Sequence, residues 1–220
     1  MLVDLNVRHK SIIIMGEGKE LEARTRQFLD ANANVRVIGK KFSRTLEQLS
    51  RCKHLELVSY TSLASLKQFL KKHKPYAVIL ATTNRPFVSK IASLFRADCK
   101  PLFYAVDMPE VNDFNMPAIA KLGDIRVAIS TVGLSPAMAH ILRKRIERTI
   151  TLEDIREVQL QAAIRAKIRE LVPDPELRRV CIYKILRNKK IKELLQKGEV
   201  ENAKKLATKQ VEQIARSLNM

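Results

Sequence analysis

Two glycines, Gly16 and Gly18, stand between a short apolar run and a stretch with helical spacing. The run at residues 11–15, Ser-Ile-Ile-Ile-Met, has the length and β-branched composition of a strand buried on both faces. Glycines after such a strand let the backbone turn tightly and approach a pyrophosphate, which the first N–H groups of the next helix can bind. The pattern is typical of a dinucleotide-binding turn. An ordinary tight turn explains the same glycines, and the usual third small residue is Leu21 here.

A second candidate position follows the apolar run at residues 35–38 and Gly39. Dinucleotide-binding proteins often have an acidic residue there, which binds the adenosine ribose. This chain has Lys40 and Lys41 instead. Two lysines are compatible with a phosphate on the ribose, so both NAD and NADP stay open. As an alternative, the two are surface lysines.

Polar residues also follow two later apolar runs. Thr82, Thr83 and Asn84 come after residues 76–80, and Asp107 comes after residues 101–106. Ligands of parallel sheets bind at the carboxyl ends of the strands. A carboxylate there suits a general base beside a bound nicotinamide. The alternative for Asp107 is an aspartate that begins a turn before a proline.

The elements that must position these residues alternate regularly. Helical patterns separate five predicted strands, which indicates βαβ units, right-handed crossovers and an α/β, Rossmann-like, doubly wound parallel sheet. A sixth strand is predicted at residues 125–130, and from Pro136 onward every segment has helical spacing. The predicted parallel strands are residues 11–15, 35–38, 55–58, 76–80 and 101–106.

The composition shows a strong excess of positive charge. There are 41 Lys and Arg against 23 Asp and Glu, which gives a net charge of +18. Such a field attracts nucleic acid, acidic lipid or a small polycarboxylate, although a solvated basic surface is also common. No apolar run is long enough to span a membrane, and the N-terminus has no secretory signal pattern. A soluble, cytoplasmic protein is expected.

Neither the cysteines nor the histidines have the spacing of a metal site. The three cysteines are odd in number and scattered, so no disulfide framework is expected. We therefore expect the protein in a reducing compartment. No metal ligand is predicted. The residues concerned are Cys52, Cys99, Cys181, His9, His54, His73 and His140.

Four blocks of the sequence resemble the precorrin-2 dehydrogenase and sirohydrochlorin ferrochelatase family, which includes the N-terminal module of siroheme synthase and its stand-alone relatives. The blocks are Ala81-Thr82-Thr83-Asn84, Val106-Asp107-Met108-Pro109-Glu110, Asp113-Phe114-Asn115-Met116-Pro117-Ala118 and Ala128-Ile129-Ser130-Thr131-Val132-Gly133-Leu134-Ser135-Pro136-Ala137. The helical tail around Pro173 and Gly198 is also similar, so the resemblance covers nearly the whole chain. Val132 stands where the family has glycine.

The resemblance implies an NAD-dependent oxidation of precorrin-2 to sirohydrochlorin, and in some members also ferrous iron insertion. Asp107 is the catalytic residue that it implies. The implied cofactor-binding residues are Gly16, Gly18, Lys19, Glu20, Lys40 and Lys41, and Thr82 and Thr83 at the sheet edge are further candidates. Candidate residues for binding the acidic groups of the tetrapyrrole are Asn84, Ser130, Thr131, Gly133 and Ser135. The alternative for the loop that contains Ser130 to Ser135 is a helix cap before Pro136.

The resemblance further implies a homodimer and three regions: a dinucleotide-binding domain at residues 1–114, a dimerisation segment at 115–150 and a helical domain at 151–220. Precorrin-2 and sirohydrochlorin carry eight carboxylates, which a strongly basic chain would attract. Nucleic acid and membranes are not expected as partners. Two other functions stay open: a chelatase without dehydrogenase activity, and a basic Rossmann-like binding or regulatory protein.

Overall fold

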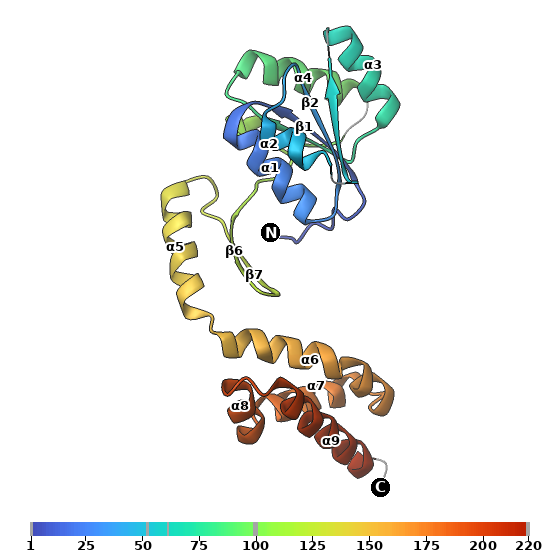
Figure 1. Cartoon of the computed structure of the whole chain (residues 1–220), viewed down its shortest axis with the longest axis vertical. Helices are drawn as coiled ribbons and strands as arrows, with labels where there is room; N and C mark the ends of the chain where they lie inside the picture. Colours follow the sequence, from blue (N-terminus) through green and yellow to red (C-terminus); the bar gives the residue numbers. More distant parts are fainter. Residues whose placement is uncertain (1, 52, 61, 99–100, 219–220) are drawn as a thin grey trace. The chain divides into compact units, whose positions relative to one another are not determined.

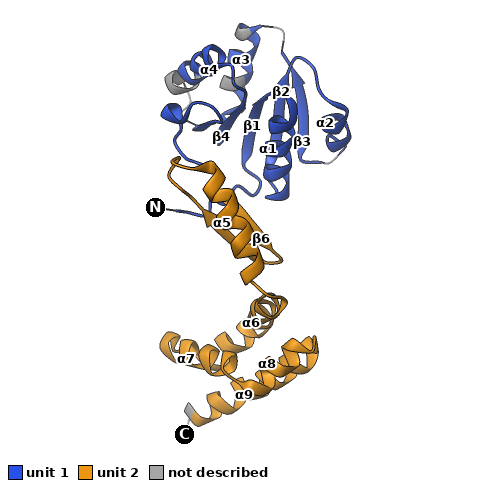
Figure 2. Cartoon of the chain, turned by 90° about the vertical axis from the view of Figure 1, so that its left-hand side faces the viewer, with its two compact units in different colours: residues 1–116 blue, residues 117–220 orange. Residues whose placement is uncertain are grey.

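The computed structural model describes residues 2–51, 53–60, 62–98 and 101–218. The chain divides into two compact units, Met1–Met116 and Pro117–Met220 (Figure 2). Each unit has its own hydrophobic core. No helix in the described parts of the chain is both long and apolar enough to cross a membrane. Cys52 and Cys99 lie outside the described residues.

The first unit contains a five-stranded parallel sheet with the order β3-β2-β1-β4-β5. This confirms the predicted Rossmann-like, doubly wound sheet. Strands β4, β1, β2 and β3 are labelled in the blue unit of Figure 2. The strands are β1 (Ser11–Gly16), β2 (Asn34–Gly39), β3 (Leu55–Ser59), β4 (Ala77–Ala81) and β5 (Leu102–Ala105). The helices between them are α1 (Gly18–Asp30), α2 (Arg44–Leu49), α3 (Leu63–His73) and α4 (Arg85–Asp98).

Helices cover both faces of this sheet, which explains why the strands read as continuous apolar runs. Side chains alternate across a strand, so Ile12 and Ile14 of β1 belong to one core and Ile13 and Met15 to the other. The first core also contains side chains of α1 and α2, and the second contains side chains of α3 and α4. Every residue from Ile12 to Met15 is therefore buried.

The strand order places a topological switch point between β1 and β4. From β1 the chain proceeds outward to β2 and β3, whereas β4 and β5 lie on the other side of β1. Connections after β1 and β4 therefore leave in opposite directions and create a crevice at the carboxyl ends of these strands. The predicted cofactor and catalytic residues of the first unit all follow strands at this edge.

The second unit begins with an antiparallel hairpin of β6 (Ala118–Leu122) and β7 (Ile125–Ile129). The predicted strand at residues 125–130 is confirmed as β7, but its partner β6 was not predicted. A two-residue loop, Gly123-Asp124, joins them, with Gly123 at a φ of 55°. Glycine at the first loop position is the pattern of a type II′ hairpin. Helix α5 (Pro136–Thr149) packs on this hairpin.

Four further helices complete the second unit, as the helical spacing after Pro136 predicted (Figure 1). A capping box between Thr151 and Asp154 begins the first of them. Their shared core includes Ile164, Ile185 and the fully buried Cys181. They are α6 (Leu152–Leu171), α7 (Pro175–Leu186), α8 (Lys189–Gln196) and α9 (Val200–Leu218).

Shortening a core side chain of α6 should destabilise this unit strongly. Ile164 is 2% exposed, so Ile164→Ala leaves a cavity and should lower the free energy of unfolding by about 2–5 kcal/mol. Val158 on the same helix is 40% exposed, and Val158→Ala should change it by less than about 0.5 kcal/mol. Urea denaturation followed by circular dichroism measures both values. Equal effects would contradict the packing described here.

Candidate functional site

The end of β1 is in direct contact with the end of β4. Gly16 has a φ of 151°, and a Cβ added to it would lie 2.0 Å from the carbonyl oxygen of Ala81. The next residue, Glu17, donates its backbone N–H to the same oxygen at 3.2 Å. No side chain fits at position 16 while the two strands keep this register. The glycine is therefore required by the close approach of two backbones.

The first turn of α1 has the geometry of an anion-binding site. Gly18 begins the helix at a φ of 68°, and a Cβ there would meet no atom within 4 Å. The N-cap residue Glu17 makes no side-chain hydrogen bond to the helix. The N–H groups of the first turn thus lack a side-chain cap, and the positive end of the helix dipole lies beside open space. This arrangement fits the pyrophosphate of a dinucleotide.

Two other predicted residues lie in the same turn of α1. Lys19 is exposed, whereas Glu20 accepts a hydrogen bond from Arg24 at 2.7 Å in an ion pair. Leu21, at the position where a third small residue is usual, is 4% exposed and belongs to the core beneath the helix. In this chain the core beneath α1 therefore accommodates a leucine at the position where a small residue is usual.

The loop after β2 presents two free cations. Lys40 and Lys41 are exposed, and neither forms an ion pair with a carboxylate in the described part of the chain. Ser43 follows them and accepts a hydrogen bond from the N–H of Leu46, which caps α2. Its hydroxyl also donates to Glu22 of α1 at 2.6 Å. This bond ties the lysine loop to the helix that follows Gly18.

The polar residues after β4 mostly serve the start of α4. Asn84 accepts the N–H of Phe87 at its Oδ1, 3.0 Å away, and thereby caps the helix. Thr82 accepts the N–H of Asn84 at 3.2 Å. Thr83 is exposed, and no hydrogen bond joins its side chain to any residue that the structure describes. The Thr83 hydroxyl therefore differs from the Thr82 hydroxyl, which already accepts a hydrogen bond within the chain.

Asp107 lies just beyond β5, at the same edge of the sheet. The N–H of Val106 donates to Leu80 at 3.0 Å, so the ladder between β4 and β5 continues to the residue before it. Asp107 itself is exposed, and the next residue, Met108, is 7% exposed and packs into the core. Among the described residues the Asp107 carboxylate has no hydrogen-bond or ion-pair partner.

Two residues that the sequence analysis did not single out hold this loop in place. Asn112 pairs with both backbone groups of Ala105, accepting its N–H at 2.7 Å and donating to its carbonyl at 3.2 Å. Asp113 accepts the N–H of Phe103 at 2.8 Å. The only local signal for these residues was the Asp113-Phe114 pair of the family block, and that pair does not indicate which residue the aspartate contacts.

An ion pair and a ring contact support the same region. Arg85 at the start of α4 pairs with Glu110 of the 3-10 helix η1 (Pro109–Val111). A backbone hydrogen bond at Glu110, together with the Arg85 guanidinium, lowers the pKa of the Glu110 carboxyl. On the α1 side, the Arg24 guanidinium lies 5.5 Å from the ring centroid of Tyr104. Burial raises the pKa of the Tyr104 hydroxyl.

The remaining predicted residues gather in one loop of the second unit, before α5. Thr131 donates to the carbonyl of Ser135 at 3.1 Å and accepts its N–H at 3.2 Å. Ser135 also caps α5 by accepting the N–H of Met138. Ser130 accepts the N–H of Val132, which has a φ of 53° and is 83% exposed. The three polar side chains therefore stabilise the loop itself.

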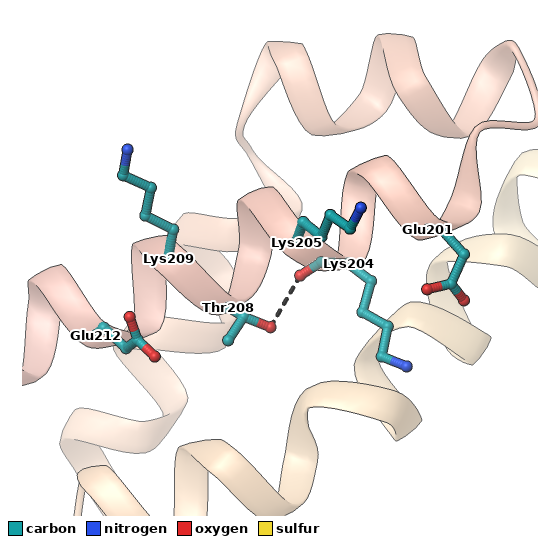
Figure 3. A pocket seen from close by; sticks show the side chains of 6 residues that line it. All are labelled: Glu201, Lys204, Lys205, Thr208, Lys209 and Glu212. Carbon is teal, nitrogen blue, oxygen red and sulfur yellow. Dashed lines mark hydrogen bonds between the residues drawn. The ribbon is translucent and has the colours of Figure 1, made fainter.

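Gly133 completes this loop at a φ of 80°, with open space where a Cβ would lie. Two hollows are found away from these residues. One of about 180 Å³ lies at the amino ends of β2 and β3, and one of about 510 Å³ lies along α9 (Figure 3). Within the residues described, no three His, Cys, Asp or Glu side chains form a metal-binding group.

Substitution of the two turn glycines should have unequal effects on stability. Gly16→Ala forces a Cβ against the Ala81 carbonyl and should cost about 3 kcal/mol of unfolding free energy. Gly18→Ala meets no atom and should cost about 1 kcal/mol, because only the left-handed backbone is strained. Urea denaturation measures both. A larger loss for Gly18→Ala would contradict the contact between β1 and β4.

Comparison with known proteins places this arrangement in a family. A family model described as "Putative NAD(P)-binding" matches residues 3–118. The chain is 28% identical over 212 residues to a siroheme synthase of Methylococcus capsulatus, and these aligned residues cover 96% of this chain and 43% of that protein. It is 28% identical over 193 residues to a precorrin-2 dehydrogenase of Methanosarcina barkeri, covering 87% of this chain and 84% of that protein.

The fold is also similar to a solved structure of SirC, precorrin-2 dehydrogenase. The TM-score is 0.73 at 16% identity, over 97% of this chain and 99% of that chain. The chain spans 43% of the Methylococcus siroheme synthase and 40% of one from Psychromonas ingrahamii. Because the family model matches residues 3–118 and these similarities extend over most of the chain, the chain belongs to the NAD(P)-binding family that comprises precorrin-2 dehydrogenases and the N-terminal modules of siroheme synthases.

Proposed function

We propose that this chain is an NAD-dependent precorrin-2 dehydrogenase that forms sirohydrochlorin. One observation carries the proposal: an uncapped glycine turn after β1 and a free carboxylate after β5 lie at the same edge of one parallel sheet. The similarity to a precorrin-2 dehydrogenase over 84% of that protein supports the same reaction.

The residues of the first unit fit a dinucleotide. Gly16 allows β1 to meet β4, and Gly18 leaves open the space that a side chain would fill. The first-turn N–H groups, including those of Lys19 and Glu20, would bind the pyrophosphate. Lys40 and Lys41 would lie at the ribose end, and Thr82 and Thr83 would line the crevice after β4. Bound NAD would supply the hydride acceptor.

Asp107 would act as the general base. Oxidation of precorrin-2 removes a hydride and a proton, and a free, solvent-accessible carboxylate at the strand end can accept the proton. The ladder to Leu80 and the clamp by Asn112 fix its backbone. The same carboxylate could accept pyrrole protons if the chain also inserts ferrous iron into sirohydrochlorin, as a bifunctional member would.

The substrate would be held through its eight carboxylates. The net charge of +18 favours attraction of such an anion. The candidate contacts are Asn84, Ser130, Thr131, Gly133 and Ser135. Hydrogen bonds within the chain already occupy Asn84 Oδ1 and the loop hydroxyls. These residues would therefore offer the Asn84 amide nitrogen, remaining lone pairs and backbone groups.

A homodimer in the cytoplasm is part of the same proposal. The hairpin and α5 display apolar side chains to solvent: Ile119, Met138 and Ile141 are 40%, 41% and 43% exposed. A second copy would bury them, with residues 115–150 as the dimerisation segment. Residues 1–114 and 151–220 would then be the dinucleotide-binding and helical domains.

The direct test is incubation of the purified chain with precorrin-2 and NAD. Nicotinamide absorbance and sirohydrochlorin should appear together. Asp107→Asn should lower the rate by about a hundredfold or more, because the proton acceptor is lost, with NAD affinity changed by less than about twofold. Glu47→Gln, an exposed carboxylate on α2, is the matched control. Equal rates for Asp107→Asn and the wild type would reject the role of Asp107.

The outcome also separates the alternatives. Metal insertion into sirohydrochlorin without any dinucleotide, and no oxidation of precorrin-2, would identify a chelatase instead. Absence of both reactions would favour a binding or regulatory protein.

Removal of the two lysines after β2 should change dinucleotide preference. The double variant Lys40→Gln/Lys41→Gln should weaken NADP binding by about tenfold and NAD binding by less than about threefold, because only NADP carries the ribose phosphate. Isothermal titration calorimetry with each dinucleotide measures the difference. Lys74→Gln/Lys90→Gln, two exposed lysines elsewhere in the unit, removes the same charge as a control. Equal losses for both dinucleotides would place the ribose elsewhere.

A further inference from the structure

The outer face of α7 carries apolar side chains that no described element covers. Leu177, Val180 and Tyr183 are 38%, 48% and 49% exposed. At about 100° per residue, Tyr183 lies about 160° around the helix from Cys181 and from Ile185, which are buried. Val180 lies about 100° from Cys181 and about 140° from Ile185. The helix therefore has a buried apolar side and, on its outer side, a second short apolar strip.

Cations lie on both sides of this strip. Arg179 and Lys184 are exposed, and the Arg187 guanidinium lies 5.9 Å from the Tyr183 ring centroid. Lys189 and Lys190 follow at the start of α8. Residues 178–192 contain seven Lys or Arg and no Asp or Glu, and the exposed Glu176 lies one turn before Val180 on the same side of α7. Five of these cations form no ion pair with a carboxylate in the described part of the chain: Arg179, Lys184, Arg187, Lys189 and Lys190. By contrast, Nζ of the nearby Lys192 lies 3.9 Å from Oε1 of Glu157.

The position of two of these lysines is unfavourable for the isolated chain. Lys189 and Lys190 lie in the first turn of α8, next to the positive end of its dipole, and no acidic residue is present there. Positive charge is thus concentrated where α7 ends and α8 begins. An external anion at this place would offset the repulsion.

We propose that this α7 face, defined as Leu177, Arg179, Val180, Tyr183, Lys184, Arg187, Lys189 and Lys190, binds the surface of an anionic lipid bilayer. Apolar side chains flanked by Lys and Arg are typical of helices that lie in a membrane interface. Tyrosine rings prefer the interface between the lipid headgroups and the hydrocarbon core, and basic residues bind the lipid phosphates. The outer face of a single helix is convex, so a fluid surface that adapts to it can cover both the strip and the cations.

Charge argues against a second copy of this chain as the occupant. Lys and Arg outnumber Asp and Glu by 19 to 11 in the first unit and by 22 to 12 in the second. Neither unit thus has an excess of acidic residues to pair with the cations of this face, whereas the proposed homodimer joins through apolar side chains of the hairpin and α5. Nucleic acid would match the cations, but interfaces with it are more polar than this strip.

Helix α9 provides a matched control surface. Lys204, Lys205 and Lys209 line the hollow on its outer side, with Glu201 and Glu212 at its two ends (Figure 3). Thr208 in the same hollow donates to the carbonyl of Lys204 at 2.9 Å. This surface has three lysines but no exposed apolar strip and no aromatic ring.

The test is flotation of the full chain with lipid vesicles. Vesicles with about one third phosphatidylglycerol in phosphatidylcholine should carry the wild type at physiological salt, and pure phosphatidylcholine vesicles should not. Arg187→Gln/Lys189→Gln/Lys190→Gln should weaken binding by about a hundredfold. Lys204→Gln/Lys205→Gln/Lys209→Gln removes the same charge and should weaken it by less than about threefold. Unchanged circular dichroism verifies that each variant folds.

A second variant tests the apolar strip. Val180→Ser/Tyr183→Ser keeps the charge and should weaken vesicle binding by about tenfold, since buried apolar area contributes to interfacial binding. Equal losses for the two charge variants would overturn the proposal, as would a wild type that stays unbound. Binding of a labelled single-stranded oligonucleotide at this face, with no effect of the serine variant on either ligand, would identify a nucleic-acid surface instead.

Discussion

The carbonyl oxygen of Ala81 lies where a side chain on residue 16 would have to be, only 2.0 Å from the position of its Cβ. β1 must therefore end in glycine, and the chain must turn at once into α1. The candidate groups of the first unit that follow β2 and β5 reach the same edge through the register of those strands with β1 and β4. Ile38, before Gly39, pairs with Met15, and Ala105, two residues before Asp107, pairs with Leu80. The close contact of β1 and β4 thus sets the geometry of the crevice.

Much of the first unit could be predicted from sequence because its strands are buried on both faces. A continuous run such as Ile12 to Met15 has few alternatives to a central parallel strand. The short helix α2 has only six residues, and its two apolar residues, Leu46 and Leu49, are too few for a strong helical pattern. Strand β6, Ala-Ile-Ala-Lys-Leu, has low β-propensity, and only the Gly123-Asp124 loop indicates the hairpin.

The sequence signals for the candidate site are local ones. Glycines before a helix and an aspartate after a strand are local signals. Asn84 and Ser135 are polar residues before helices, and such residues can cap a helix, bind a ligand or do both. The structure shows the cap in each case. Asn112 and Asp113 were missed because their partners lie seven and ten residues away on β5, and no local pattern specifies such pairs.

Asn112 and Asp113 have a consequence beyond the loop that they hold. β5 is the last strand of the sheet, and an outermost strand with free N–H and C=O groups can add a strand from another molecule. Here the side-chain amide of Asn112 satisfies both backbone groups of Ala105, while Asp113 satisfies those of Phe103 through its carboxylate and its own N–H. Side chains take the place of a sixth strand. That border of the sheet is closed to templated growth, which protects a crowded solution of this protein from fibrous aggregation by that route.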